Sequence, residues 1–265
     1  MRGLILAAGE GKRALKVTGS YLKCLFPISD RSDTLLGTLI SQLHAAMIQD
    51  LVIVGGYRYN ELQAFLSRFC SRTNIYTEYI LLNASPECSQ GPIFSFLRTE
   101  SECSSNDQCL LLPADTLFHP RLFSWLSSLE DSFASFPDKT IHLVYADYLL
   151  GISDKSQIIA CDSNSQVSDI RTYKAWKKLS FASSSSPKVM IPIVIFPNSF
   201  FLVARRGVES GFTQVIQLLI DLLMNGSEWK IYAHHFKAES WIFQDFDNPA
   251  DFQKVSSLLK KIQEE

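Results

Sequence analysis

The chain has 265 residues, 46% of them hydrophobic, so it can bury a sizeable core and fits one large α/β domain. It carries 25 Lys and Arg residues against 27 Asp and Glu residues, a net charge of −2, with no long run of either sign. This balance argues against nucleic acid or an anionic membrane as the principal partner and favours a small ligand.

Short apolar runs alternate with helical patterns through the first half of the chain. The runs typical of central strands, covered on both faces of a sheet, are residues 3–7, 51–54, 108–113 and 140–146. Between them, residues 34–48 and 60–69 carry apolar side chains at helical spacing. This alternation predicts β-α-β units and a largely parallel sheet.

The second half is less regular and predicts a mixed edge to the sheet. Strands are expected over residues 157–160, 189–196 and 229–236, and a helix over residues 213–224. Residues 183–187 read as an exposed loop. A last helix is expected from Pro249 to about Lys261, after the good N-cap residues Asp247 and Asn248. The fold class is therefore α/β, a single domain over residues 1–265, with a Rossmann-like, mainly parallel sheet and helices on both faces.

The apolar stretches and the cysteines indicate in which cellular compartment the protein is expected. The longest apolar stretch, residues 212–224, contains Gln214, Gln217 and Asp221 and falls short of the roughly 20 residues that a membrane span needs. The six cysteines form no Cys-x-x-Cys pair, which argues against a zinc site or a disulfide framework. We expect a soluble, cytoplasmic protein with reduced thiols and no membrane partner.

The first strand runs into a glycine-rich turn, Ala7-Ala8-Gly9-Glu10-Gly11-Lys12-Arg13, whose backbone N–H groups can approach a phosphate. A P-loop would require Gly at Leu6 and Ser or Thr at Arg13, so that motif fails.

Gly9, Gly11 and Ala14 match the spacing of the dinucleotide-binding motif Gly-x-Gly-x-x-Gly/Ala. That motif must open a helix directly and be followed by a second strand ending in an acid. The residues from Arg13 to Pro27 lack helical periodicity, and the strand over 51–54 offers no acid. The dinucleotide-binding motif is therefore disfavoured.

A third family explains more residues. Leu6 to Arg13, followed by Lys23-Cys24-Leu25-Phe26-Pro27, resembles the signature of the sugar-phosphate and choline-phosphate nucleotidyltransferases. Further landmarks follow in that family's order and end at Phe252: Gly55-Gly56-Tyr57, Gln90-Gly91-Pro92, Leu112-Pro113-Ala114-Asp115-Thr116 and Asp245-Phe246-Asp247-Asn248-Pro249-Ala250-Asp251-Phe252.

This resemblance implies a GT-A-like nucleotidyltransferase fold and an activity. The protein would use Mg²⁺ to transfer a nucleoside monophosphate from a nucleoside triphosphate, CTP or UTP, to a small phosphorylated acceptor, with release of pyrophosphate. The acceptor would be a sugar 1-phosphate or phosphocholine. Residues 1–120 would bind the nucleotide and residues 121–265 the acceptor. Which nucleotide and which acceptor, and whether the chain forms a homo-oligomer, stay open.

An anionic acceptor must approach a polyanion, so the site needs cations more than a nucleophilic side chain. Arg13 can grip phosphate oxygens bidentately and Lys23 can supply a mobile charge near the α-phosphate, so both are assigned to catalysis. The resemblance implies that the residues contacting the nucleotide are Leu6, Ala8, Gly9, Glu10, Gly11, Lys12, Gln90 and Gly91.

The metal assignment falls on Asp115 and Asp247. Asp115 follows a central strand, at the edge where ligands gather in open α/β sheets. Mg²⁺ commonly uses one or two carboxylates, so two aspartates far apart in sequence can share one ion. The structural alternative for each is a helix N-cap, and Asp245 competes with Asp247 as the ligand.

The acceptor side carries the weakest pattern. Lys174 is assigned to the acceptor phosphate, by analogy with a lysine of the sugar-using relatives. Lys12, Leu22 and the absence of Gly from residues 191–196 depart from the family and leave the acceptor open. The residues considered for a quaternary-ammonium box, a role less common for aromatics than the core, are Phe94, Phe96, Trp176, Phe196, Phe201 and Trp241.

Two other functions remain in view. A non-catalytic regulatory subunit of the same fold would keep the pocket but lose the charged residues of the site. All four of these residues are present here, which favours an enzyme: Arg13, Lys23, Asp115 and Asp247. A transferase acting on a molybdopterin-type cofactor is suggested by the segment from Leu112 to Thr116, but the long stretch between Arg13 and Lys23 argues against it.

Overall fold

Strands and helices alternate along the chain. The structure, a computed structural model, describes residues 1–19, 21–29, 33–73, 78–103, 108–147, 153–179, 186–237 and 241–264. Its strands are β1 (Arg2–Ala7), β2 (Asp50–Gly55), β3 (Glu78–Asn83), β4 (Gln108–Pro113), β5 (Thr116–Phe118), β6 (Thr140–Ala146), β7 (Gln157–Cys161), β8 (Val167–Thr172), β9 (Lys188–Pro197), β10 (Lys230–His235) and β11 (Phe243–Asp245). Its α-helices are α1 (Leu15–Thr18), α2 (Leu35–Ala45), α3 (Tyr59–Thr73), α4 (Pro92–Leu97), α5 (Arg121–Ser128), α6 (Glu130–Ala134), α7 (Tyr173–Leu179), α8 (Phe200–Glu209), α9 (Val215–Met224) and α10 (Pro249–Glu264).

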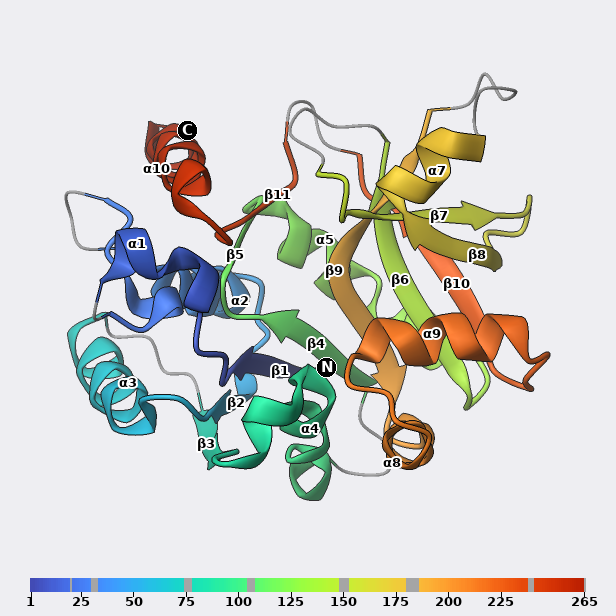
Figure 1. The fold of residues 1–265 in the computed structure, drawn as a ribbon, viewed down its shortest axis with the longest axis horizontal. Helices are drawn as coiled ribbons and strands as arrows, with labels where there is room; N and C mark the ends of the chain where they lie inside the picture. Colours follow the sequence, from blue (N-terminus) through green and yellow to red (C-terminus); the bar gives the residue numbers. More distant parts are fainter. Residues whose placement is uncertain are drawn as a thin grey trace.

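The main sheet is mixed and mainly parallel. Its strand order in the described chain is β10-β6-β9-β4-β1-β2-β3, with the antiparallel pair β7 and β8 joined to β9 (Figure 1). Strands β4, β1, β2 and β3 run parallel to one another, and β6 runs parallel to β10. Strand β9 lies between β4 and β6 and is antiparallel to both. The predicted α/β class and the mixed edge are confirmed.

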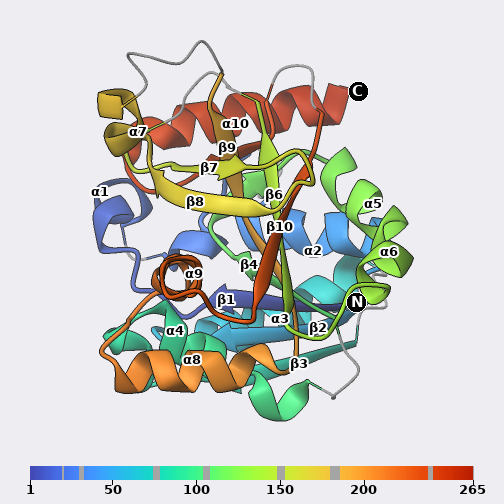
Figure 2. The same cartoon turned by 90° about the vertical axis from the view of Figure 1, so that its right-hand side faces the viewer.

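Helices cover both faces of this sheet, as Figure 2 shows. Consecutive residues of β1 point to opposite faces: Ile5 packs with α2, α3 and α5, whereas Leu4 packs with α4, α8 and α9. Because side chains alternate along a strand, burial of both faces requires a continuous apolar run. For this reason the four apolar runs over residues 3–7, 51–54, 108–113 and 140–146 could be identified as strands from the sequence. No helix within the described ranges is long and apolar enough to cross a membrane, and all six cysteines are free thiols.

The element boundaries follow local chemistry. Helix α2 begins after Thr34, whose hydroxyl accepts a hydrogen bond from the Gly37 N–H, and it ends before Met47, which has a positive φ of 63°. Helix α9 starts two residues later than predicted because Gln214 forms a capping box with Gln217. Residues 183–185 of the predicted loop lie outside the described residues.

The elements that the sequence did not predict are short or half exposed. Strand β3 lies at the sheet edge, and its apolar run from Tyr79 to Leu82 is only partly buried. Strands β5 and β11 have three residues each and pair with one another in a separate antiparallel sheet. Helix α10 packs over this small sheet: its Val255 and Leu259 share an apolar cluster with Leu117 of β5 and with Phe246, the residue after β11.

The adjacent residues His234 and His235 point to opposite faces of β10, as strand geometry predicts. His235 lies 3.1 Å from the carboxylate of Asp147, whereas the Nε2 atom of His234 lies 3.0 Å from Nδ1 of His142. His142 is fully buried, and its Nε2 atom has no partner among the described residues. Desolvation, with repulsion from His234, lowers the pKa of His142 to about 3.

The buried His142 predicts a loss of stability in mild acid. Its pKa of about 3 in the folded protein lies below the unfolded value of about 6.5, so the unfolded chain binds more protons as pH falls below that value. The contribution of this residue to the free energy of unfolding should fall by about 2 kcal/mol between pH 7 and pH 5. Urea unfolding of the wild type and of His142→Leu at both pH values measures it. An equal pH dependence in the two proteins would contradict this prediction.

Candidate active site

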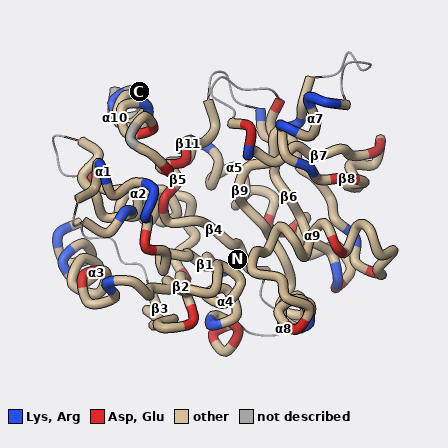
Figure 3. The backbone as a smooth tube through the Cα atoms, viewed as in Figure 1, with Lys and Arg blue, Asp and Glu red and all other residues tan. Residues whose placement is uncertain are grey.

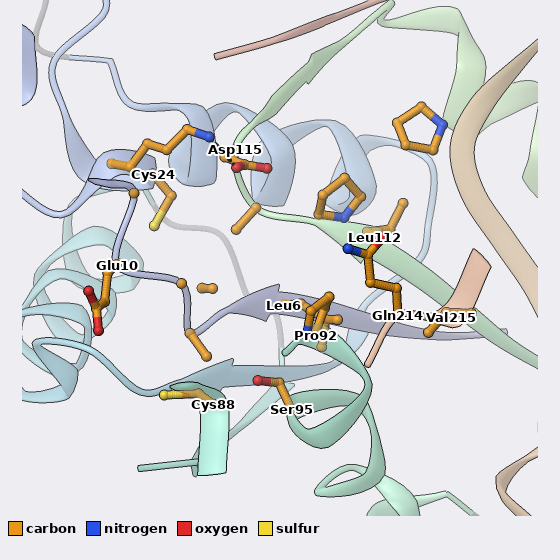
Figure 4. Close-up of a pocket in the computed structure, with 18 of the residues that line it drawn as sticks. Leu6, Glu10, Cys24, Cys88, Pro92, Ser95, Leu112, Asp115, Gln214 and Val215 are labelled. Carbon is orange, nitrogen blue, oxygen red and sulfur yellow. Dashed lines mark hydrogen bonds and ion pairs between the residues drawn. The ribbon is translucent and has the colours of Figure 1, made fainter. Parts of the chain in front are cut away.

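A cavity of about 660 Å³ opens at the carboxyl ends of β1 and β4 (Figure 4). Its walls come from the turn after β1, the 3-10 helix Lys23–Leu25, the start of α4, strand β9 and the residues that open α9. The predicted nucleotide-contacting residues that line it are Leu6, Ala8, Gly9, Glu10, Gly11 and Lys12. Ligands gather at this edge of open α/β sheets.

The two glycines of the first turn have different surroundings. Gly11 has a φ of 63°, and a Cβ atom there would lie 2.8 Å from Cβ of Lys23. A Cβ atom on Gly9 would meet nothing within 4 Å. Gly11 therefore lets the Lys23 side chain cross the turn, whereas Gly9 leaves room beside the cavity.

The segment after this turn differs from the sequence-based expectation, because it forms short helical turns. They are the 3-10 helix Lys12–Ala14 and the four-residue α1, which ends before Gly19. The second strand, β2, ends at Gly55 without an acid. A dinucleotide-binding motif requires an acid at the end of the second strand, and the structure does not meet this requirement.

The Gly11 contact predicts different effects of two small substitutions. Gly11→Ala should displace Lys23 and reduce kcat for pyrophosphate release at least about tenfold, because a misplaced electrostatic group loses its effect on the transition state. Gly9→Ala should act mainly on nucleotide affinity. Steady-state kinetics and calorimetric nucleotide Kd values for both variants measure this. Equal effects of the two variants on kcat would contradict it.

The four charged residues singled out in the sequence lie in one network. The buried Lys23 ammonium lies 2.5 Å from Oδ2 of Asp115 and 2.9 Å from Oδ1 of Asp247. Arg13 makes two contacts of 3.0 Å to the Asp247 carboxylate. Burial opposes protonation of Lys23, but the two carboxylates outweigh it and raise its pKa. Lys23 is therefore a permanent cation at neutral pH.

The small sheet explains how Asp247 reaches Asp115. Strand β5 begins directly after Asp115, and its Thr116 pairs with Asp245 of β11. The N–H of Phe246 also donates to the carbonyl of Asp115 at 3.0 Å. Asp247 is the next residue, so this pairing sets the two aspartates beside the same ammonium.

Asp245 has a different environment from Asp247. Its carboxylate accepts a 2.6 Å hydrogen bond from the Thr116 hydroxyl. Although Asp245 keeps exposed surface, its carboxyl group is surrounded by protein, and this desolvation raises its pKa to about 6, helped by repulsion from Asp115 and Asp247. The structure thus brings Asp247, rather than Asp245, into contact with Lys23 and Arg13.

The donor set fits a hard divalent cation that also binds a ligand. No three His, Cys, Asp or Glu side chains of the described ranges are arranged to hold a metal without a ligand's help. Two carboxylates lie on either side of the Lys23 ammonium, one of them also paired with Arg13, and Mg²⁺ commonly takes one or two carboxylates plus phosphate oxygens and water. Asp115 and Asp247 would hold the ion.

The cavity also contains a thiol beside Lys23. Cys24 is almost fully buried, and this desolvation raises its pKa to about 12. The thiol therefore stays protonated at neutral pH and lacks the thiolate form that acts as a nucleophile.

The turn assigned to the base differs from the sequence-based assignment. Gln90 is exposed, and neither it nor Gly91 lines the cavity. Gly91 has a φ of 134°, and a Cβ atom there would lie 2.5 Å from the carbonyl oxygen of Thr213. At Gly91 the backbone therefore approaches that of Thr213 closely. The residues that form this wall are Cys88, Ser89, Pro92 and Ser95.

The residues assigned to the acceptor lie outside this cavity. Lys174 is exposed on α7, its N–H bonds the carbonyl of Asp154, and it does not line the cavity. The aromatic residues considered for a quaternary-ammonium box do not line it either, and Phe96, Phe196 and Phe201 pack against one another in the core.

The sequence analysis did not identify Ser95, Pro192, Val194 or Gln214, which line the cavity. Gln214 carried a detectable signal, because it precedes a strong helix at a capping position. Ser95 carried a weaker one, a lone hydroxyl three residues after Pro92 in an apolar helix. Nothing in the sequence marked Pro192 and Val194, which read as ordinary strand residues.

Known structures share this fold. The inositol-1-phosphate CTP transferase from T. maritima is 18% identical, with a TM-score of 0.71, and the match covers 99% of this chain and 96% of that one. A UDP-glucose pyrophosphorylase complexed with UDP-glucose is 18% identical, with a TM-score of 0.75 and coverage of 98% of both chains. The CTP:phosphocholine cytidylyltransferase from Streptococcus pneumoniae is 16% identical, with a TM-score of 0.69 and coverage of 97% and 98%. No curated protein sequence matches the chain.

The family is established by sequence. The profile of the MobA-like NTP transferase domain matches residues 3–150, which is more than half of the chain. The matched region contains the first turn, Lys23 and Asp115. The chain belongs to the MobA-like NTP transferase family.

Proposed function

We propose that the protein transfers a nucleoside monophosphate from a nucleoside triphosphate to a small phosphorylated acceptor, with release of pyrophosphate. The observation that carries the proposal is the contact of Lys23 with Asp115 and Asp247, and of Arg13 with Asp247. These residues come from segments up to 234 positions apart: Arg13, Lys23 and Asp115 line one cavity, and Asp247, which does not line it, contacts Arg13 and Lys23. A pocket that only binds a ligand or regulates a partner would not require two cations and two carboxylates in contact with one another.

The chemistry assigns a role to each cation. An acceptor phosphate oxygen attacks the α-phosphorus as the bond to pyrophosphate breaks, and negative charge builds on the oxygens around it. Lys23 opposes that charge near the α-phosphate, while Arg13 orients the phosphates bidentately. Mg²⁺, held by Asp115 and Asp247, would neutralise the triphosphate and orient the leaving group.

The nucleotide and acceptor are proposed by analogy. The related structures are named for CTP, UDP-glucose, inositol 1-phosphate and phosphocholine. We therefore propose CTP or UTP as the donor and a sugar 1-phosphate, a related polyol phosphate or phosphocholine as the acceptor. Residues 1–120 would form the nucleotide half, and residues 121–265 would add the acceptor wall through β9 and Gln214. Residues of both charge signs are interspersed along the chain in Figure 3, consistent with a small ligand.

A nucleotide screen followed by turnover tests this proposal. A ligand that binds only the folded state raises the unfolding temperature, so CTP, UTP, GTP, dTTP and ATP are compared with Mg²⁺. Pyrophosphate release is then measured with the best nucleotide and a panel of phosphorylated acceptors. Stabilisation by no nucleotide would overturn the proposal, and stabilisation without turnover on any acceptor would favour a regulatory subunit.

A further inference from the structure

One hydroxyl group in the cavity wall has no partner within the protein. Ser95 lies on α4 with 3% of its surface exposed, and its hydroxyl makes no hydrogen bond to any described residue. Two buried hydroxyls away from the cavity are paired: that of Thr99 donates to the Phe96 carbonyl at 2.8 Å, and that of Thr116 to Asp245. The Ser256 hydroxyl is buried without a partner among the described residues, but it does not line the cavity. The Ser95 hydroxyl faces the cavity, so it is available to water or to a bound ligand.

The position of Ser95 follows from how α4 begins. Pro92 is the first helical residue, and Ser95 is three residues later on the same side of the helix. Both line the cavity, whereas Ile93 and Phe96 are fully buried in the core. The Ser95 hydroxyl is therefore held by a packed helix instead of a loop.

The cavity has two chemically different ends. Figure 4 shows Ser95 beside Cys88 at one end and Asp115 with Cys24 at the other. The charged network of Lys23 and Asp115 belongs to the second end. Around Ser95 the described lining residues are uncharged: Leu6, Ala8, Cys88, Ser89 and Pro92. A nucleotide would place its phosphates at the charged end and its uncharged ring at the Ser95 end.

We propose that the Ser95 hydroxyl hydrogen-bonds the edge of the nucleobase and so contributes to nucleotide selection, an inference that rests on the proposed function. A hydroxyl can donate or accept, so it can pair with a ring carbonyl, a ring nitrogen or an exocyclic amino group. Its fixed position on α4 makes the contact available only to a base whose polar edge reaches that point. Nucleotides that lack such an edge would leave the hydroxyl unpaired.

The test compares ligands with and without a base. Ser95→Ala should weaken binding of the preferred nucleoside triphosphate about 3- to 10-fold, the range expected for one neutral hydrogen bond. Binding of inorganic tripolyphosphate, which has no base, should be unchanged, and the difference in Kd between preferred and other nucleotides should shrink. Calorimetry with Mg²⁺ present measures all of these values.

Stability separates this role from a structural one. Because the Ser95 hydroxyl bonds nothing in the described protein, Ser95→Ala should leave the unfolding temperature without ligand unchanged or raise it. Thr99→Val is the matched control, since its hydroxyl is buried and paired but lies off the cavity: it should lower the unfolding temperature and leave nucleotide Kd unchanged.

The outcomes distinguish two failures. If the wild type binds no nucleoside triphosphate, the proposed function falls and this inference with it. If the wild type binds one and Ser95→Ala binds it equally well, or loses tripolyphosphate to the same extent, only the role of Ser95 is overturned. A lower unfolding temperature of ligand-free Ser95→Ala would instead assign the hydroxyl to packing.

Discussion

Lys23→Ala is expected to lower kcat for pyrophosphate release by about 100-fold or more, at least about 2.7 kcal/mol, while changing nucleotide Kd much less. The ammonium opposes charge that builds only as the bond to pyrophosphate breaks, so its effect should be larger in the transition state than with bound nucleotide. Lys23→Arg keeps the charge with a different shape and reach, and should restore part of the activity.

Steady-state pyrophosphate release and calorimetric nucleotide Kd test this expectation. Lys16→Ala is the control, because Lys16 is an exposed lysine nearby in sequence that does not line the cavity. Loss of Lys23 also leaves Asp115 and Asp247 without their shared cation. The unfolding temperature of Lys23→Ala without metal should fall, and Mg²⁺ should restore part of it. Turnover of Lys23→Ala within a few-fold of wild type would refute the catalytic assignment.

Asp115→Ala is expected to reduce pyrophosphate release on the order of 10³-fold and to leave the fold intact. Asp115 follows the buried strand β4 and is itself only partly buried, so its removal costs little packing. It does remove one of the two carboxylates that would hold Mg²⁺. Asp115→Asn should be almost as inactive, because it keeps the shape of the side chain and loses its charge.

Two measurements check the metal assignment independently of chemistry. Calorimetric titration with Mn²⁺ in the presence of nucleotide should show weaker metal binding by Asp115→Asn and by Asp247→Asn than by the wild type. Asp162→Asn serves as the control, because that aspartate is exposed in the turn between β7 and β8. Full activity in EDTA, or in either Asp115 variant, would rule out the metal role.

The inner part of the fold was predictable because it is buried on both faces. Strands β1, β2, β4 and β6 agree with the predicted runs to within one residue at each end. Strand β3 was not predicted, although its apolar run from Tyr79 to Leu82 is as long as that of residues 51–54 in β2. The three-residue strands β5 and β11 are too short to show any periodicity.

The charged half of the site was predictable for another reason. Arg13, Lys23 and Asp115 stand in motifs whose chemistry can be argued from residue type and spacing, and the structure brings them together with Asp247. The uncharged half of the site was not predictable, because a cavity-lining residue such as Val194 cannot be told from other strand residues by sequence alone. Gln90, which the resemblance assigns to the nucleotide, is exposed and does not line the cavity, so its role stays a prediction.

The pairing of β5 with β11 affects the order in which the molecule can be completed during synthesis. Thr116 meets Asp245 across 129 positions of chain, so the contact forms only after the polypeptide as far as Asp245 has left the ribosome. Strands β1 to β4 can assemble earlier and already carry the first turn, Lys23 and Asp115. Until β11 arrives, Lys23 has one carboxylate instead of two. A nascent or truncated chain that lacks β11 therefore contains Lys23 and Asp115 without the complete charged network, and the arrival of β11 and Asp247 completes it.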